Sequence, residues 1–170
     1  MSASSCRKPK PTEREIEGGE SMQRRKVEQN VLFLCEDNAC LSQMAEAAAR
    51  HLGPPKTRIF SAGVKPKAIP LRVVQAMQEL GISMSGQKSK SLADVPIQEI
   101  DLVVSIDDAH KQCGNLPGQV RIERWPISPG FQSDAEGDPT LTTIRNRRDE
   151  IDKRVFALFL DHWRNIPRTS

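Results

Sequence analysis

A cysteine at the boundary between a strand and a helix is the first candidate for chemistry in this chain. Residues 31–34 are all apolar and run directly into Cys35, and an Ala-rich helical pattern begins near Ser42. This order places the thiol among backbone N–H groups at a helix N-terminus, where an oxyanion binds. The predicted oxyanion-binding loop around Cys35 comprises Glu36, Asp37, Asn38, Ala39, Cys40 and Leu41.

The Cys35 thiol is the candidate nucleophile of this loop. Loop amides and the helix dipole are expected to lower the pKa of the thiol and favour the thiolate, which is the reactive form. The alternative is a buried, inert cysteine at the end of a strand. The residues that follow Cys35 favour a site over that alternative.

Strand and helix patterns alternate from residue 30 onward, which predicts βαβ units and a parallel sheet. Strands are expected at residues 31–34, 57–62, 101–106 and 120–125. The apolar run of the first strand indicates burial on both faces. We therefore predict an α/β fold of three layers, with a four-stranded parallel sheet and helices on both faces. In such sheets the site lies beyond the carboxyl ends of the strands, which is where Cys35 falls.

Three stretches show helical periodicity. Residues 42–52 place Met44, Ala45, Ala48 and Leu52 on one face, and residues 53–55 (Gly-Pro-Pro) end this helix. Residues 70–80 begin with proline and end at a glycine, as helices often do. A long closing helix is expected from Leu141 to about Trp163, with an apolar stripe of Leu141, Ile144, Ile151, Val155, Leu158 and His162.

Several motifs together resemble the low-molecular-weight protein tyrosine phosphatases and the thioredoxin-coupled arsenate reductases. The family loop reads Cys, five residues, Arg, then Ser or Thr, and residues 35–42 follow it except at the arginine. Residues 61–63 (Ser-Ala-Gly), 81–92 (Gly-Ile-Ser-Met-Ser-Gly-Gln-Lys-Ser-Lys-Ser-Leu) and 101–105 are also similar to family segments. Trp125, residues 136–137 (Glu-Gly) and residues 148–151 continue the resemblance. The match covers about residues 30–160.

The resemblance implies roles for individual loop residues. Cys35 would attack a phosphoryl group or arsenate, and Ser42 would stabilise its thiolate. Asn38 would shape the loop, and in some arsenate reductases this asparagine helps to bind potassium. Ordinary alternatives exist, because Ser42 also suits a helix N-cap and Asn38 suits a turn with positive φ.

Leu41 stands where the family has the loop arginine. That arginine forks onto two oxyanion oxygens and balances the charge on the transferring group. Leucine has neither charge nor donor, and loss of a dominant electrostatic contact typically costs about 10²–10³-fold in rate. Glu36 and Asp37 add negative charge, which further disfavours a dianion. Leu41 could instead turn inward, onto the helix face that contains Met44.

Two further parts of the family chemistry are altered. The aspartate that serves as general acid is missing from its usual place, and Asp134 and Asp138 are shifted candidates, of which Asp138 keeps the Asp-Pro dipeptide. Both are otherwise ordinary turn residues. In the redox relay, Cys113 matches the distal cysteine, whereas Asp107 replaces the proximal one. The same loop spacing in some phosphatases gives a protective disulfide, here Cys35–Cys40; otherwise Cys40 is a small buried residue.

Composition limits the number of domains, the classes of partner and the cellular compartment that we expect for the protein. The chain has 170 residues, 37% of them hydrophobic and 28% charged, which suggests one globular domain with a tail. No apolar run approaches the roughly 18 residues of a membrane span, so no membrane association is expected. The net charge of +3 lies largely in the tail and is weak support for nucleic-acid binding, which we do not predict. Four scattered cysteines favour a reducing cytoplasm.

The first 29 residues differ from the rest. They are rich in Ser, Lys, Arg, Glu, Pro and Gly and have almost no apolar residues, which predicts a disordered tail. They lack the apolar stretch of a signal peptide, and Met22 is an alternative start. The expected division is a tail at residues 1–29 and a phosphatase or arsenate reductase-like domain at residues 30–165.

Three functional hypotheses follow. The first is a family member with an oxyanion-binding loop and impaired catalysis. If active, it would be a cysteine-dependent phosphatase or arsenate reductase acting on a phosphate- or arsenate-like oxyanion or a phosphoprotein. Thioredoxin is then a candidate partner, and we predict no cofactor and no metal. The second is a pseudo-enzyme that binds or regulates, and the third is a thiol redox sensor built on Cys35 and Cys40.

Overall fold

The computed structural model describes residues 30–164, except 115, 129, 131–132 and 134. The expected disordered tail (1–29) and Asp134 lie outside the described residues, and so does the side chain of His162. In the described part, no helix is long and apolar enough to cross a membrane.

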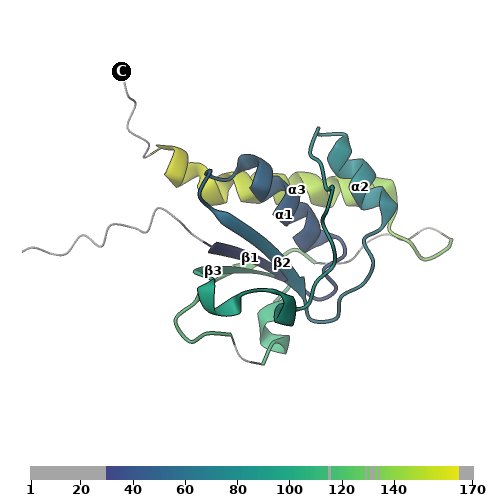
Figure 1. Ribbon diagram of the computed structural model, residues 1–170. Helices are drawn as coiled ribbons and strands as arrows, with labels where there is room; N and C mark the ends of the chain where they lie inside the picture. The colour runs from purple at the N-terminus through teal and green to yellow at the C-terminus, as the bar shows by residue number, and fades with distance from the viewer. Residues whose placement is uncertain (1–29, 115, 129, 131–132, 134, 165–170) are drawn as a thin grey trace, which may run out of the picture.

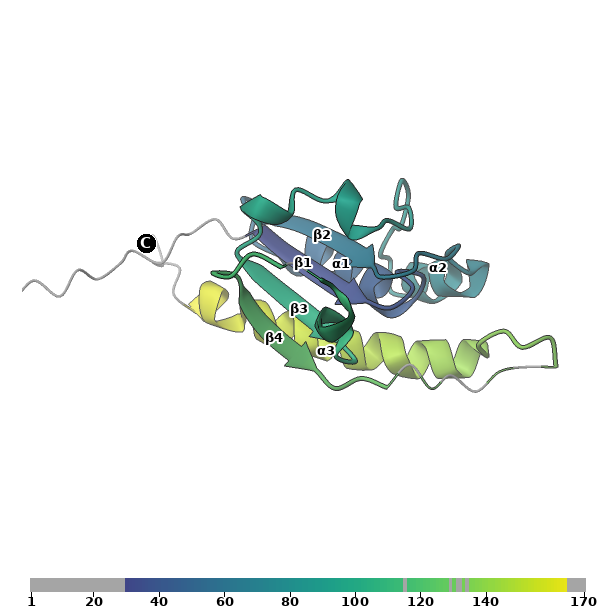
Figure 2. The same cartoon turned by 90° about the horizontal axis from the view of Figure 1, so that it is seen from below.

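Four parallel strands form one sheet (Figures 1 and 2). They are β1 (Asn30–Cys35), β2 (Arg58–Gly63), β3 (Leu102–Ile106) and β4 (Arg121–Trp125). The order across the sheet is β2-β1-β3-β4, so the first strand lies between two neighbours. Every predicted strand is present, with its ends shifted by one residue in most cases. Cys35 pairs with Gly63 at the carboxyl end of β1.

The three α-helices gather on one face of the sheet, and short 3-10 helices cover the other (Figure 1). The α-helices are α1 (Leu41–Leu52), α2 (Leu71–Gln78) and α3 (Leu141–Arg164). The other face carries η1 (Leu92–Asp94), η2 (Ile97–Glu99) and η3 (Ala109–Gln112). The four-stranded α/β fold with two covering layers is confirmed. On the second face, the described helices are 3-10 helices of three or four residues rather than the α-helices of the first face.

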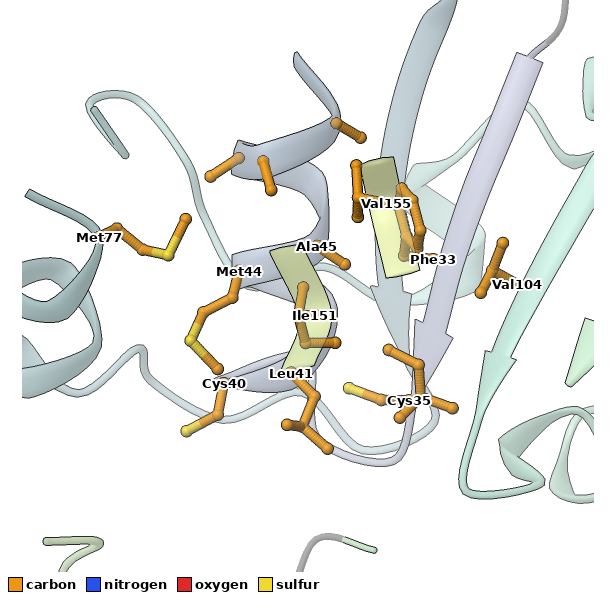
Figure 3. Close-up of a cluster of buried hydrophobic side chains, with 14 of the residues drawn as sticks. Phe33, Cys35, Cys40, Leu41, Met44, Ala45, Met77, Val104, Ile151 and Val155 are labelled. Carbon is orange, nitrogen blue, oxygen red and sulfur yellow. The ribbon is translucent and has the colours of Figure 1, made fainter. Parts of the chain in front are cut away.

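Alternate side chains of the central strands build two separate cores, as the pleat of a strand requires. Val31 and Phe33 of β1 point toward the α-helices, where Met44, Ile151 and Val155 also lie. Leu32 and Leu34 point to the opposite face and pack with Val95 and Ile100 beside the 3-10 helices. Figure 3 shows the first core, which continues down to Cys35 and Leu41. The Cys35 loop therefore adjoins the larger of the two cores.

Helix α1 begins one residue earlier than expected, and its N-cap is Cys40 rather than Ser42. No side chain caps its first turn. Ser42 is the second residue of the helix, and its side chain is buried with the hydroxyl in contact with the Cys35 sulfur. The N-cap alternative for Ser42 is therefore wrong, because the loop that follows β1 enters the helix at Leu41. The helix ends as predicted at Gly53, whose N–H donates to the Ala49 carbonyl.

Candidate functional site: the Cys35 loop

The loop after β1 surrounds a small pocket of about 50 Å³ at the carboxyl end of the sheet. Asp107 and Gln112, which follow β3, close its far side. The pocket is therefore formed by segments that are distant in sequence and meet at one edge of the sheet. Its complete lining is Cys35, Glu36, Asp37, Cys40, Leu41, Ile106, Asp107 and Gln112.

The Cys35 sulfur is held by the loop and by the first turn of α1. The backbone N–H of Asn38 donates to Cys35 Sγ at 3.2 Å. The Ser42 hydroxyl lies 2.8 Å from the same sulfur. Both contacts stabilise a negative charge on sulfur, as the sequence predicts for a nucleophile.

Burial nevertheless has the largest effect on the pKa of this thiol. Desolvation raises the pKa of Cys35 above its ordinary value, and the negative charge of Asp37 raises it further. The Ser42 hydroxyl and the backbone N–H groups of Ser42 and Asn38 act in the opposite direction but do not overcome burial. The expectation of a lowered pKa is therefore wrong for this structure: Cys35 is only 4% exposed and has a carboxylate beside it.

Asn38 is the centre of a polar network beneath the loop. Its φ is +47°, in the left-handed region that asparagine tolerates better than most residues. Its amide donates to Ser42 Oγ at 2.8 Å, and its Oδ1 accepts from Gln43 Nε2 at 2.9 Å and from the Lys90 N–H at 2.7 Å. Asn38 thus has both suggested roles, since it adopts the turn conformation and its side chain shapes the loop.

A buried carboxylate lies one helical turn beyond this network. Glu46 of α1 is fully buried, and its Oε2 accepts from Lys90 Nζ at 3.2 Å and from the Ser61 hydroxyl. Arg50 pairs with its other oxygen. Neither Glu46 nor Gln43, which is also fully buried, was predicted from the sequence. The available signal was two polar residues inside an Ala-rich helix whose neighbours are all apolar or small.

Leu41 is only 4% exposed and packs in the core that contains Met44 and Ala45 (Figure 3). Its side chain still forms one wall of the Cys35 pocket. Among the described residues, no Lys, Arg or His lines that pocket, whereas three carboxylates do: Glu36, Asp37 and Asp107. The backbone N–H groups of the loop therefore suit an anion, whereas the charged side chains that line the pocket repel one.

Comparison with known proteins places this geometry in a family. A family model described as low molecular weight phosphotyrosine protein phosphatase matches residues 30–123, more than half of the chain. The chain belongs to this family. It is 32% identical over 127 residues to an arsenate reductase of Bacillus licheniformis, covering 74% of this chain and 91% of that protein. An arsenate reductase of Staphylococcus aureus is 33% identical over 126 residues, covering 74% and 92%.

Solved structures of family members agree with the fold. An arsenate reductase in its phosphate-binding state is 29% identical, has a TM-score of 0.63, and covers 78% of this chain and 98% of its own. A thioredoxin-dependent arsenate reductase of Corynebacterium glutamicum is 27% identical with a TM-score of 0.60, covering 78% and 61%.

Cys40 is near Cys35 but is not poised to pair with it. Its side chain points away from Cys35, with Leu41 between the two (Figure 3). Burial raises the pKa of Cys40 to about 12, and the charges of Asp37 and Cys35 add to the effect. Cys35, Cys40 and Cys113 are all free thiols.

Cys113 and Asp138 do not line the Cys35 pocket. Cys113 packs with the second core, on the other face of the sheet, and its Sγ donates to the Ala109 carbonyl at 3.4 Å. Asp138 is exposed, and the carbonyl of the adjacent Pro139 accepts from Arg72 at the start of α2. Neither residue is therefore brought to Cys35, whereas Asp107, in the place of the proximal relay cysteine, is.

The described residues include no group of three or more His, Cys, Asp or Glu side chains arranged to hold a metal ion. His110 uses its ring for a local contact, with Nδ1 2.7 Å from the Ser105 hydroxyl. The groups placed at the site are the Cys35 thiol, the loop amides, the Ser42 hydroxyl and the surrounding carboxylates.

Proposed function

We propose that this protein is a family member whose Cys35 loop retains the oxyanion-site scaffold but has impaired phosphatase and arsenate reductase chemistry. The observation that carries the proposal is the lining of the pocket, in which Leu41 stands in place of the arginine and none of the described lining residues is a Lys, Arg or His. A dianionic phosphate or arsenate would meet three carboxylates there. Electrostatic stabilisation of the transferring group commonly contributes more to such catalysis than any other effect, and here the charged side chains that line the pocket oppose it.

The state of the thiol supports the same proposal. A nucleophilic cysteine must be a thiolate, and burial disfavours the thiolate of Cys35 by raising its pKa. The remaining positive contributions are backbone N–H groups and the Ser42 hydroxyl. The protein would then act by binding or regulation, in a reducing cytoplasm that keeps its three described cysteines free.

Neither redox alternative gains support from the geometry. A disulfide switch between Cys35 and Cys40 needs a reactive thiolate, yet the pKa values of both thiols are raised. The arsenate reductase relay needs a third thiol near the first, and Cys113 lies on the opposite face of the sheet. Coupling to thioredoxin is therefore not included in the proposal, although one relative is described as thioredoxin-dependent.

Turnover of p-nitrophenyl phosphate by the purified protein tests the proposal. We expect no turnover above the blank for the natural protein or for Leu41→Met, which keeps an apolar side chain of similar size. Leu41→Arg restores the missing charge and is expected to give turnover above the blank, as a gain of about 10²-fold in rate would produce, provided that Cys35 is present. The double variant Leu41→Arg with Cys35→Ser is the control for that requirement. Turnover by the natural protein at a rate equal to that of Leu41→Arg would overturn the proposal.

A further inference from the structure

The side chain of Asp37 turns back into the Cys35 loop. Its Oδ1 accepts the backbone N–H of Ala39 at 3.1 Å. The Cys35 sulfur lies 3.8 Å from the same oxygen. Asp37 is half-buried and lines the pocket. A carboxylate oxygen therefore lies where it meets both a loop amide and the thiol, as an oxygen of a bound oxyanion would.

The backbone of the loop is fixed with its carbonyls directed outward. The carbonyls of Cys35, Glu36 and Asp37 accept N–H groups from the chain beyond β2, at 3.2, 2.7 and 2.8 Å. These three peptide groups carry the N–H groups of Glu36, Asp37 and Asn38, which therefore face the inside of the loop. The N–H of Asn38 donates to Cys35 Sγ and the N–H of Ala39 donates to the Asp37 carboxylate, so both amides are already engaged inside the loop.

We propose that Asp37 is the resident anion of this loop and determines its specificity by excluding phosphate-like oxyanions. The inference deepens the proposed function and rests on it, but it concerns Asp37 and not Leu41. An external oxyanion must displace the carboxylate from the Ala39 N–H and then remain beside it. The displaced carboxylate has no cation to pair with among the residues lining the pocket. Exclusion thus arises from occupation of the donor as well as from repulsion between like charges.

The intramolecular position of the carboxylate makes this competition effective. Asp37 lies only two residues before Ala39, whose N–H its carboxylate accepts. The carbonyl of Asp37 is itself held by the Lys67 N–H and by the Ser89 hydroxyl, the latter at 3.4 Å. A group tethered this closely competes at a high effective concentration, which a free ligand at cellular levels does not match. The loop can therefore keep its shape without a ligand.

Binding of inorganic phosphate tests the inference without reference to turnover. Three variants separate the contributions. Asp37→Ala removes charge and acceptor; Asp37→Asn removes the charge but keeps an oxygen for the Ala39 N–H. Glu36→Gln removes a neighbouring charge from an exposed side chain on the same pocket.

Phosphate affinity is measured by calorimetry at constant ionic strength. Protection of Cys35 from iodoacetamide by phosphate, followed by mass spectrometry, places the ligand at the loop.

We expect Asp37→Ala to bind phosphate about tenfold to a hundredfold more tightly than the natural protein and to protect Cys35. Asp37→Asn should gain less than Asp37→Ala, and Glu36→Gln should stay close to the natural protein. Equal gains in Asp37→Asn and Asp37→Ala, or no gain beyond that of Glu36→Gln, would overturn the inference. If Asp37→Ala does not fold, as judged by circular dichroism, Asp37→Ser takes its place. None of these results bears on whether the natural protein turns over an aryl phosphate, so the two proposals fail separately.

Discussion

The sulfur of Cys35 accepts a hydrogen bond from the Asn38 N–H and lies beside the Ser42 hydroxyl. The pKa of the thiol is nevertheless raised, because Cys35 is buried and lies next to Asp37. A single residue thus combines the contacts of a nucleophile with the protonation state of a core cysteine. The pKa of a thiol depends on the sum of these effects, and desolvation is the largest here. The reactivity of Cys35 is therefore an experimental measure of the whole loop.

We expect alkylation of Cys35 by iodoacetamide to be slow at pH 7 and to keep rising up to and beyond about pH 9. The reason is that only the thiolate reacts and the pKa of this thiol lies above its ordinary value. Ser42→Ala removes a hydroxyl that lowers the pKa, so its alkylation should be slower at every pH below the pKa of the thiol. Rates are followed by mass spectrometry of the Cys35 peptide. A rate that reaches its plateau below about pH 8 would contradict the raised pKa.

At the scale of elements, periodicity and turn residues were sufficient to predict the four strands and the three α-helices, but not every helix end. The apolar run of residues 31–34 is found as β1, whereas α2 ends at Gln78, before the predicted stop at Gly81. The site was predictable only in part. The position of Cys35 follows from the end of β1, but the placement of the Asp37 carbonyl and the burial of Glu46 depend on partners far along the chain, Lys67 and Lys90. A sequence pattern does not encode such contacts directly.

The end of β2 supports the loop through a close backbone approach. A Cβ at Gly63 would lie 2.7 Å from the Asn38 nitrogen and 2.9 Å from the Asp37 carbonyl carbon. We expect Gly63→Ala to destabilise the protein by about 1–3 kcal/mol, since backbone atoms cannot move aside easily. Gly118→Ala is the matched control, because a Cβ there meets nothing within 4 Å. Urea unfolding measures both variants, and equal stabilities would show that the loop yields without cost.

At the scale of the whole molecule, α3 closes the fold by packing against the first two helices (Figure 2). Two arginines of α3 hold the end of α2. Arg145 Nε donates to Glu79 Oε2 at 2.9 Å, and Arg148 Nη1 donates to the same oxygen at 3.0 Å and to the Ala76 carbonyl at 2.8 Å. Arg145 and Arg148 lie 66 and 69 residues beyond Glu79 in the chain. These contacts should therefore report on the closure of the entire fold.

Acid should weaken this closure in a defined range of pH. Hydrogen bonds from Arg145 and Arg148 lower the pKa of Glu79 from 4.5 to about 2. Since the folded pKa lies below the unfolded one, the contribution is fully present above about pH 4.5 and is lost as the pH falls toward 2. We expect Glu79→Gln to lower the urea midpoint at pH 7, and its difference from the natural protein to shrink over that range.

Glu150→Gln is the control for this prediction. Glu150 pairs with Arg147 and Arg154 within α3 itself, so its loss should cost only about 0.3–0.5 kcal/mol per pair and leave the docking of α2 unchanged. Added salt should reduce the Glu79 effect, because the pair with Arg145 is partly exposed to solvent. A difference between Glu79→Gln and the natural protein that stays constant from pH 7 to pH 2 would mean that Glu79 acts through packing. The charge link between α2 and α3 would then have no part in closing the fold.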